Sequence, residues 1–145
     1  MATVAEVLKS KPEARVHCVA PTDTVLSALR LMADKSIGAL MVMDGEKIAG
    51  IFTERDYARK VALEGRSSGE TPVSEIMTRA VRFVHLDQST EECMALMTEN
   101  RLRHLPVVEN GRLQGLLSIG DLVKHIISQQ QFVIEQMEQY ITGGW

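Results

Sequence analysis

The residue pattern with the most chemical content occurs twice in this chain of 145 residues. Residues 50–56 read Gly-Ile-Phe-Thr-Glu-Arg-Asp, and residues 115–121 read Gly-Leu-Leu-Ser-Ile-Gly-Asp. A short carboxylate beside a strand-to-helix turn can accept two hydrogen bonds from a cis-diol. The start of the helix offers free backbone N–H groups and a positive dipole end to phosphate. The pattern therefore indicates ribose and phosphate binding.

The same spacing also has a purely structural interpretation. A hydroxyl residue followed three positions later by an acid forms a helix cap that needs no ligand. Either copy taken alone fits both interpretations. Capping explains neither the glycines, Gly50 and Gly115, nor the presence of aspartate in both copies.

The two patterns end the two halves of an internal duplication. A shift of 65 positions aligns residues 16–60 with residues 81–125 without a gap, and 8 of the 45 aligned pairs are identical. Most other pairs keep their chemical type. The sequence therefore predicts two copies of one unit, which we expect to pair about a pseudo-twofold axis because each unit has an apolar face.

Each copy shows the local signals of a strand, a helix, two strands and a second helix, in that order. The first strand is predicted over residues 16–19 or 81–84, and apolar residues at three and four spacing predict the helix that follows. Ser89 and Glu92 form a capping box for the second of these helices. We expect the strand-helix-strand crossover to be parallel.

The last two strands of each copy are predicted to form a hairpin, which ends at the helix that begins with Thr53 or Ser118. Asp44-Gly45 and Asn110-Gly111 are typical hairpin turns. The strands are predicted over residues 39–43 and 48–52 in the first copy, and 105–108 and 113–117 in the second. The fold class is therefore mixed α+β of α/β type, with sheets packed against helices.

Further segments lie outside the repeat. Residues 3–6 predict a capping box and a short helix to about Ser10, and residues 73–77 are its counterpart before the second copy. Apolar residues after Asp121 predict a long C-terminal helix that ends at Gly143-Gly144, and a second identical subunit would cover its excess apolar surface. The predicted domains are repeat 1 with its N-terminal helix (1–63), a linker (64–72), repeat 2 (73–128) and a helical extension with a tail (129–145).

The composition excludes several classes of protein. With 16 basic and 19 acidic residues the net charge is −3, which argues against a general nucleic-acid partner. No apolar stretch approaches the roughly 20 residues that a membrane helix needs. The chain starts without a basic segment followed by an apolar one and has only two cysteines, Cys18 and Cys93, which we expect to be core residues. We expect a soluble cytoplasmic protein with no membrane partner.

No residue pattern predicts catalysis or a metal site. His17, His85 and His125 have no acidic or cysteine neighbours at ligand spacing. No nucleophile with a base and an orienting group is evident. We therefore predict no enzyme and no catalytic cofactor.

The order and doubling of these features resemble a tandem pair of CBS domains, also called a Bateman module, from about Val4 to Ile127. The matching features are the repeated element order, Ile76-Met77-Thr78 before Val81, the run from Arg103 to Val108 before the second hairpin, and the two Gly-x-x-[Thr/Ser]-x-x-Asp ends. The resemblance implies a stand-alone regulatory module with two related clefts between the copies. It implies AMP, ADP, ATP, NAD or a related adenosyl compound as ligand, and an effector protein of unknown identity.

The resemblance also assigns roles by position. It implies ribose contacts from Thr53 and Asp56 in one cleft and from Ser118 and Asp121 in the other. It implies phosphate contacts from Arg103, His104 and Arg55. It implies adenine contacts from Val16, His17, Ile37 and Gly38 for one cleft, and from Thr78, Val81, Arg82, Leu102 and Arg103 for the other.

The first copy departs from this pattern. It has Gly38-Ala39 where the second copy has Arg103-His104, and Met41 where the second copy has Pro106. We therefore expect the two clefts to differ in affinity or ligand. The cleft reached by the basic residues should prefer the more highly charged ligand.

Three functions stay open at this point. The favoured one is an adenine-nucleotide sensor that passes its ligand state to a partner or to its own assembly. The second is a ligand-independent module for dimerisation or partner docking, in which both aspartates only cap helices. The third is a small enzyme that acts on a nucleotide, and for this one the sequence has no catalytic constellation.

Overall fold

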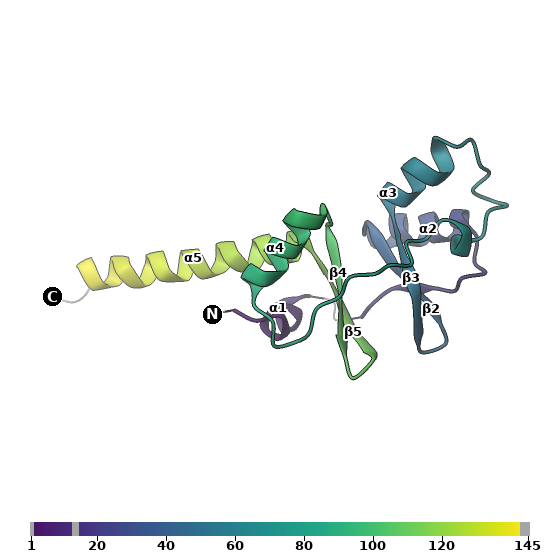
Figure 1. The fold of residues 1–145 in the computed structure, drawn as a ribbon. Helices are drawn as coiled ribbons and strands as arrows, with labels where there is room; N and C mark the ends of the chain where they lie inside the picture. The colour runs from purple at the N-terminus through teal and green to yellow at the C-terminus, as the bar shows by residue number, and fades with distance from the viewer. Residues whose placement is uncertain (1, 13–14, 143–145) are drawn as a thin grey trace. The chain divides into compact units, whose positions relative to one another are not determined.

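The computed structural model describes residues 2–12 and 15–142, and the chain forms two compact units (Figure 1). One unit, the N/C unit, comprises Met1–Ala14, Val84–Val107 and Leu116–Trp145. The other, the central unit, comprises Arg15–Phe83 and Val108–Gly115. No helix of the described residues is long and apolar enough to span a bilayer.

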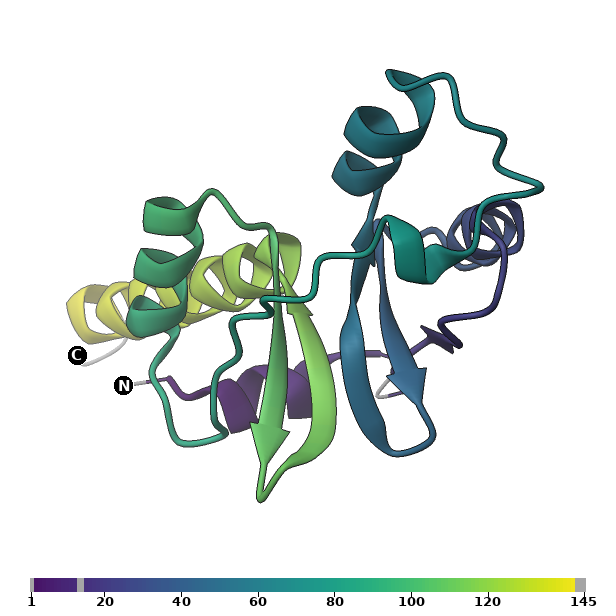
Figure 2. The ribbon, with the colours of Figure 1, turned by 45° about the vertical axis from the view of Figure 1, so that its right-hand side comes forward.

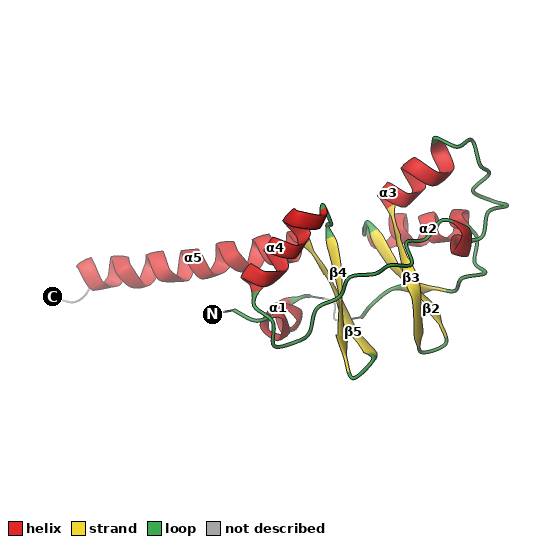
Figure 3. Ribbon diagram, viewed as in Figure 1, coloured by secondary structure: helices red, strands yellow, loops and turns green. Residues whose placement is uncertain are grey.

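The central unit is built on a three-stranded sheet in the order β1-β2-β3 (Figure 3). β1 pairs parallel with β2, and β2 pairs antiparallel with β3, as predicted for the crossover and the hairpin. Gly45 adopts φ +64° in the hairpin turn, a conformation that glycine takes without strain. Its elements are β1 (Cys18–Val19), α2 (Val25–Lys35), β2 (Ala39–Asp44), β3 (Lys47–Thr53), α3 (Glu54–Tyr57), the π-helical turn η1 (Ala58–Ala62) and the 3₁₀ turn η2 (Val73–Glu75).

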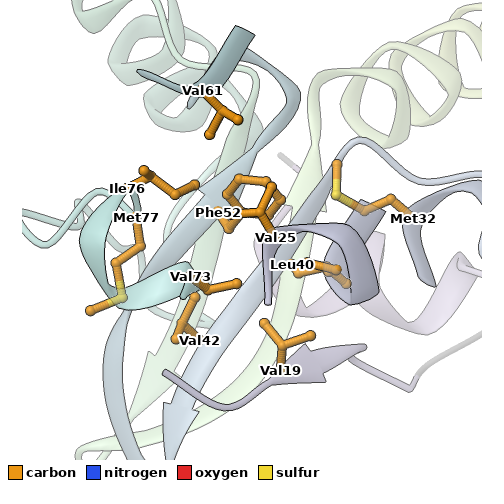
Figure 4. Close-up of a cluster of buried hydrophobic side chains, with 11 residues drawn as sticks. Val19, Val25, Met32, Leu40, Val42, Phe52, Val61, Val73, Ile76 and Met77 are labelled. Carbon is orange, nitrogen blue, oxygen red and sulfur yellow. The ribbon is translucent and has the colours of Figure 1, made fainter. Parts of the chain in front are cut away.

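The core of the central unit lies between its sheet and α2 (Figure 4). Phe52 and Leu40 from the sheet and Val25 from α2 are fully buried. Val73 and Ile76 join this core, although they precede the second copy in the sequence. The segment that introduces the second repeat is therefore part of the unit that holds the first.

The N/C unit contains residues 104–107 and 116–118 of the β4–β5 hairpin, and residues 108–115 of that hairpin, with its turn, belong to the central unit (Figure 2). Asn110 and Gly111 take φ 52° and 75° in its turn, and the predicted Ser89–Glu92 capping box is present. Val4 and Val7 of the N-terminal helix lie in the core of this unit, so the leading segments of the two copies are exchanged. Its helices are α1 (Val4–Ser10), α4 (Thr90–Asn100) and α5 (Ile119–Thr142), and it shares the strands β4 (His104–Glu109) and β5 (Arg112–Ser118) with the central unit.

The predicted first strands of both copies were too long. β1 contains only Cys18 and Val19, and in place of the strand over residues 81–84 there is a single parallel bridge between Val84 and Val107. In the first copy the amide of Met41 donates to the carbonyl of His17 at 3.3 Å. The matching position in the second copy is Pro106, which has no N–H, so the parallel ladder cannot extend to Arg82.

The segment predicted as a linker caps the start of α2. The amides of Val25 and Leu26 donate to the carbonyls of Thr71 and Ser68, both at 2.9 Å. These bonds satisfy N–H groups that the helix itself leaves unpaired. Residues 64–72 are therefore tied to the central unit by defined contacts.

The predicted C-terminal helix is confirmed over Ile119–Thr142. Leu122 is its only residue in the buried core of the N/C unit. The predicted end at Gly143-Gly144 lies outside the described residues.

Candidate functional site

The aspartate of the first motif forms a complete capping box at the start of α3. Thr53 Oγ1 accepts from the amide of Asp56 at 3.2 Å. In return Asp56 Oδ2 accepts from the amide of Thr53 at 3.0 Å and from its hydroxyl at 3.1 Å. The structural interpretation of this spacing is therefore correct for the local geometry of the first copy.

The other oxygen of Asp56 is also occupied. Oδ1 accepts from the hydroxyl of Thr78 at 3.0 Å and lies 3.0 Å from Nζ of Lys60. Lys60 additionally donates to the carbonyl of Ile76 at 3.1 Å. Four donors thus reach a carboxylate that has about four lone-pair sites, and the side chain of Asp56 is only 8% exposed. Asp56 holds the segment of Ile76 and Thr78 against the start of α3.

The segment that contains Thr78 also explains why residue 50 is a glycine. Ile51 and Thr78 exchange two backbone hydrogen bonds, of 3.0 Å and 2.8 Å. A Cβ atom on Gly50 would lie 2.6 Å from the carbonyl oxygen of Thr78 and 3.0 Å from Sδ of Met77. The glycine that capping left unexplained is needed for this close backbone approach.

The aspartate of the second motif has a different environment at the start of α5. Asp121 Oδ2 accepts from the amide of Ser118 at 2.8 Å, and Ser118 Oγ accepts from the amide of Asp121 at 3.1 Å. Nζ of Lys11 lies 2.9 Å from the same Oδ2 and donates to the carbonyl of Leu116 at 2.7 Å. With 20% of its side chain exposed, Asp121 is more open to solvent than Asp56.

The charges around Asp121 shift two pKa values. Burial alone would raise the pKa of Asp121, but the hydrogen bond from the Ser118 amide and the hydrogen bond and charge of Lys11 together lower it. Burial lowers the pKa of His104, which the charge of Asp121 opposes and the charges of Lys11 and Arg103 reinforce. At neutral pH this site therefore holds a carboxylate, two fixed cations and a neutral imidazole.

The structure divides the predicted site residues between the two units. Arg103 lies beside the start of α5, because its carbonyl accepts from the amide of Ile119 at 2.8 Å. Gly38 holds the equivalent place at α3, where its carbonyl accepts from the amide of Glu54 at 3.1 Å. The N/C unit contains Leu102, Arg103, His104, Ser118 and Asp121, and the central unit contains Val16, His17, Ile37, Gly38, Thr53, Arg55, Asp56, Thr78, Val81 and Arg82.

Several of these side chains have identifiable contacts of their own. Ile37 and Leu102 pack against the cores of their respective units. Thr78, predicted as an adenine contact, donates its hydroxyl to Asp56. Arg55, Arg82 and Arg103 are exposed.

Sequence reasoning missed both lysines that pair with the aspartates. Lys60 lies one helical turn after Asp56, and this i,i+4 spacing was a readable signal for an ion pair. Lys11 precedes Asp121 by 110 positions, and no sequence pattern links them. Cys18 was predicted to be a core residue and is exposed, because side chains alternate between the two faces of a strand and Val19 takes the buried face of β1.

Cys93 was also predicted to be a core residue, and it is fully buried in the N/C unit. Burial raises the pKa of its thiol to about 11, with a smaller contribution from the charge of Glu92. At neutral pH the thiol is therefore protonated, which makes it unreactive as a nucleophile.

Comparisons with known proteins identify the repeated fold as that of CBS domains. The family model described as CBS domain matches residues 4–63 and residues 73–128, and the chain belongs to this family. The CBS domain-containing protein CBSX3, mitochondrial, of Arabidopsis thaliana is 36% identical, and the match covers 99% of this chain and 73% of that protein.

Solved structures agree with the family assignment. A protein with CBS domains from Burkholderia ambifaria, described as a candidate in signal transduction, is 60% identical with a TM-score of 0.86, and the match covers 89% of this chain and 96% of that one. The CBS domain pair of protein MJ0100, in complex with 5′-methylthioadenosine and S-adenosyl-L-methionine, shares the fold with a TM-score of 0.76. It is 24% identical, and the match covers 89% of this chain and 98% of that one.

Proposed function

We propose that this protein is a regulatory sensor that binds an adenine nucleotide and is not an enzyme. The observation that carries the proposal is the environment of Asp121: a partly exposed carboxylate at the start of a long helix, with a lysine, an arginine and a neutral histidine around it. A carboxylate recognises ribose hydroxyls, while cations and a helix N-terminus recognise phosphate. AMP, ADP, ATP and NAD carry both groups.

We further propose that the two motifs bind ligand with different affinity. Among the described residues at most three internal donors reach Asp121, from the amide and hydroxyl of Ser118 and from Lys11, so acceptor capacity remains for one ribose hydroxyl. Asp56 must give up an internal donor before it can accept from a ligand. A hydrogen bond to a charged group contributes about 1.5–3 kcal/mol, so ribose binding at Asp56 should be about 10-fold weaker or more.

The other implied contacts remain part of this proposal. Ser118 and Asp121 are the proposed ribose contacts of one motif, and Thr53 and Asp56 are the weaker ribose contacts of the other. Arg103, His104 and Arg55 are the proposed phosphate contacts. The proposed adenine contacts are Val16, His17, Ile37, Gly38, Thr78, Val81, Arg82, Leu102 and Arg103.

Calorimetric titration with AMP, ADP, ATP and NAD tests the sensor proposal. We expect Asp121→Asn to weaken binding of the preferred nucleotide at least 10-fold and Asp56→Asn to weaken it less. Asp87→Asn is the control, because Asp87 is exposed and belongs to neither motif. If no nucleotide binds the wild-type protein, or if Asp121→Asn binds it unchanged, the proposal is wrong.

A scaffold function is the second candidate, and the exposed face of α5 favours it. Six of its residues, Phe132, Val133, Ile134, Met137, Tyr140 and Ile141, are 54–84% exposed. A large apolar surface that is exposed to water marks an interaction site. We propose that a second copy of this chain covers it, so that the protein is a homodimer.

The charges of α5 support a protein as its partner. Residues 125–142 contain Glu135 and Glu138 but no lysine or arginine, so an anionic membrane or a nucleic acid would be repelled. Sedimentation equilibrium should give a dimer for the wild type and a monomer for Met137→Glu. A monomeric wild type at micromolar concentration would refute this part.

The effector and the location of the protein are also proposals. We propose that ligand binding is passed to an effector protein through differential affinity for two states. We propose the cytoplasm as the location, whereas the name of the Arabidopsis relative places that protein in the mitochondrion. Fractionation of cells followed by immunodetection distinguishes the two compartments.

A further inference from the structure

Lys11 reaches the second motif from the opposite end of the chain. Its ammonium lies 2.9 Å from Asp121 Oδ2 and 2.7 Å from the carbonyl oxygen of Leu116. It follows directly on α1, whose Val4 and Val7 are fully buried in the core of the same unit. The position of Lys11 is therefore fixed by the packing of α1.

The two copies reach the same ion pair by different routes. In the first copy Asp56 pairs with Lys60, four residues further along the same helical segment. The position equivalent to Lys60 in the second copy is His125, so the motif does not provide its own lysine there. The side chain of Lys11 is 25% exposed, against 45% for Lys60, and it is the more buried of the two.

An ammonium has three N–H donors, and Lys11 uses two of them on Asp121 and Leu116. Asp121 has room for one further donor, so the second hydroxyl of a ribose cis-diol competes with Lys11 for the carboxylate. An uncharged nucleoside would leave Lys11 without a counter-ion in a partly buried place, which is unfavourable. A ligand phosphate would replace the lost partner.

We propose that Lys11 selects phosphorylated ligands at the Asp121 site, by exchanging its ion pair with the carboxylate for one with the ligand's phosphate. This inference rests on the proposed nucleotide-binding function and assigns to it a specificity-determining residue. Arg103 supplies a second cation next to the site, and His104 is neutral at pH 7, so the fixed positive charges are those of Lys11 and Arg103. Ligand exchange at Lys11 acts directly on the end of α1.

Calorimetric titration with AMP and with adenosine tests the assignment. We expect the wild type to prefer AMP, and we expect Lys11→Met to lower the ratio of AMP affinity to adenosine affinity about 10-fold or more. Lys11→Arg should keep most of the preference, because it keeps the charge. Lys9→Met is the matched control: Lys9 is exposed on the same helix and should leave the ratio unchanged.

Lys11→Gln is a second test in case Lys11→Met fails to fold. Its side-chain amide carries no charge but can still donate a hydrogen bond to the Leu116 carbonyl. It should lower the ratio as Lys11→Met does. If both variants weaken AMP and adenosine by the same factor, or weaken neither, Lys11 has no role in selection and the inference is overturned while the nucleotide-binding proposal stands. If the wild type binds neither AMP nor adenosine, the inference about Lys11 fails, and the titrations with ADP, ATP and NAD decide the nucleotide-binding proposal separately.

Discussion

Replacement of Gly50 by alanine tests the packing of the first motif. The added Cβ would lie 2.6 Å from the carbonyl oxygen of Thr78, and this oxygen accepts the 3.0 Å hydrogen bond from the amide of Ile51. Sδ of Met77, 3.0 Å away, belongs to a flexible side chain and can move aside. The backbone of Thr78 can move only if its pairing with Ile51 weakens.

The cost follows from these contacts. Overpacking in a tight interior costs about 1–3 kcal/mol, and each of the two backbone hydrogen bonds between Ile51 and Thr78 contributes about 0.5–1.5 kcal/mol. Alanine also restricts the unfolded chain, and this stabilises the folded protein by about 0.4–1 kcal/mol and offsets part of the loss. We expect a net destabilisation of about 2–4 kcal/mol, and at about 3 °C for each kcal/mol the Tm should fall by about 6–12 °C.

Thermal unfolding followed by circular dichroism measures this change. Gly69→Ala is the matched control, because its Cβ would meet only Cδ2 of Leu26 at 3.9 Å, an ordinary contact distance. That variant should unfold within about 2 °C of the wild type, since its stability should change by less than about 0.5 kcal/mol. A Gly50→Ala protein that is as stable as Gly69→Ala would refute the close approach of Thr78 to β3.

Three further predictions concern stability. Thr78→Val removes a hydrogen bond to the buried Asp56 carboxylate and should cost about 1.5–3 kcal/mol in urea unfolding, with Thr78→Ser losing much less. Phe52→Ala, at a side chain that is 0% exposed, should lower the free energy of unfolding by about 3–5 kcal/mol. Leu63→Ala, at a side chain that is 80% exposed, should change it by less than about 0.5 kcal/mol, and equal losses in the two variants would contradict the assigned core. Because the pKa of His104 is lowered in the folded protein, the unfolded chain binds a proton first as the pH falls below about 6.5, and stability should decrease until the pH passes the pKa of the folded protein. The pKa of Asp121 is also lowered in the folded protein, so further stability should be lost below about pH 4. Thermal scans between pH 7.5 and pH 3 should show both decreases, and His104→Gln should remove the first one; an unchanged slope in that variant would exclude His104 as its source.

Local signals were sufficient for most of the secondary structure. Glycine and asparagine tolerate positive φ, so Asp44-Gly45 and Asn110-Gly111 fixed the two hairpins before any tertiary contact was considered. The same holds for the capping box of Ser89 and Glu92, whose partners are three residues apart. The length of the first strands was predicted wrongly, although Pro106 carried the signal that ends the parallel pairing in the second copy.

The exchange of leading segments was not readable from the sequence. Val73 and Ile76 precede the second copy but pack in the core of the central unit, while Val4 and Val7 precede the first copy and pack in the core of the N/C unit. Periodicity shows that such residues are buried, but it does not show against which sheet. That choice depends on contacts between residues that are far apart in the chain.

The sequence by itself determined the duplication, the element order and the two aspartate motifs, because these depend on residue type and on spacings of a few positions. Tertiary structure decided which donors surround each aspartate. Packing brings Thr78 to Asp56, whose carboxylate is then saturated together with the local partner Lys60, and it brings Lys11 to Asp121 across 110 positions of sequence. The acceptor capacity of a carboxylate is set by the donors around it, and those donors are assembled only when the chain folds.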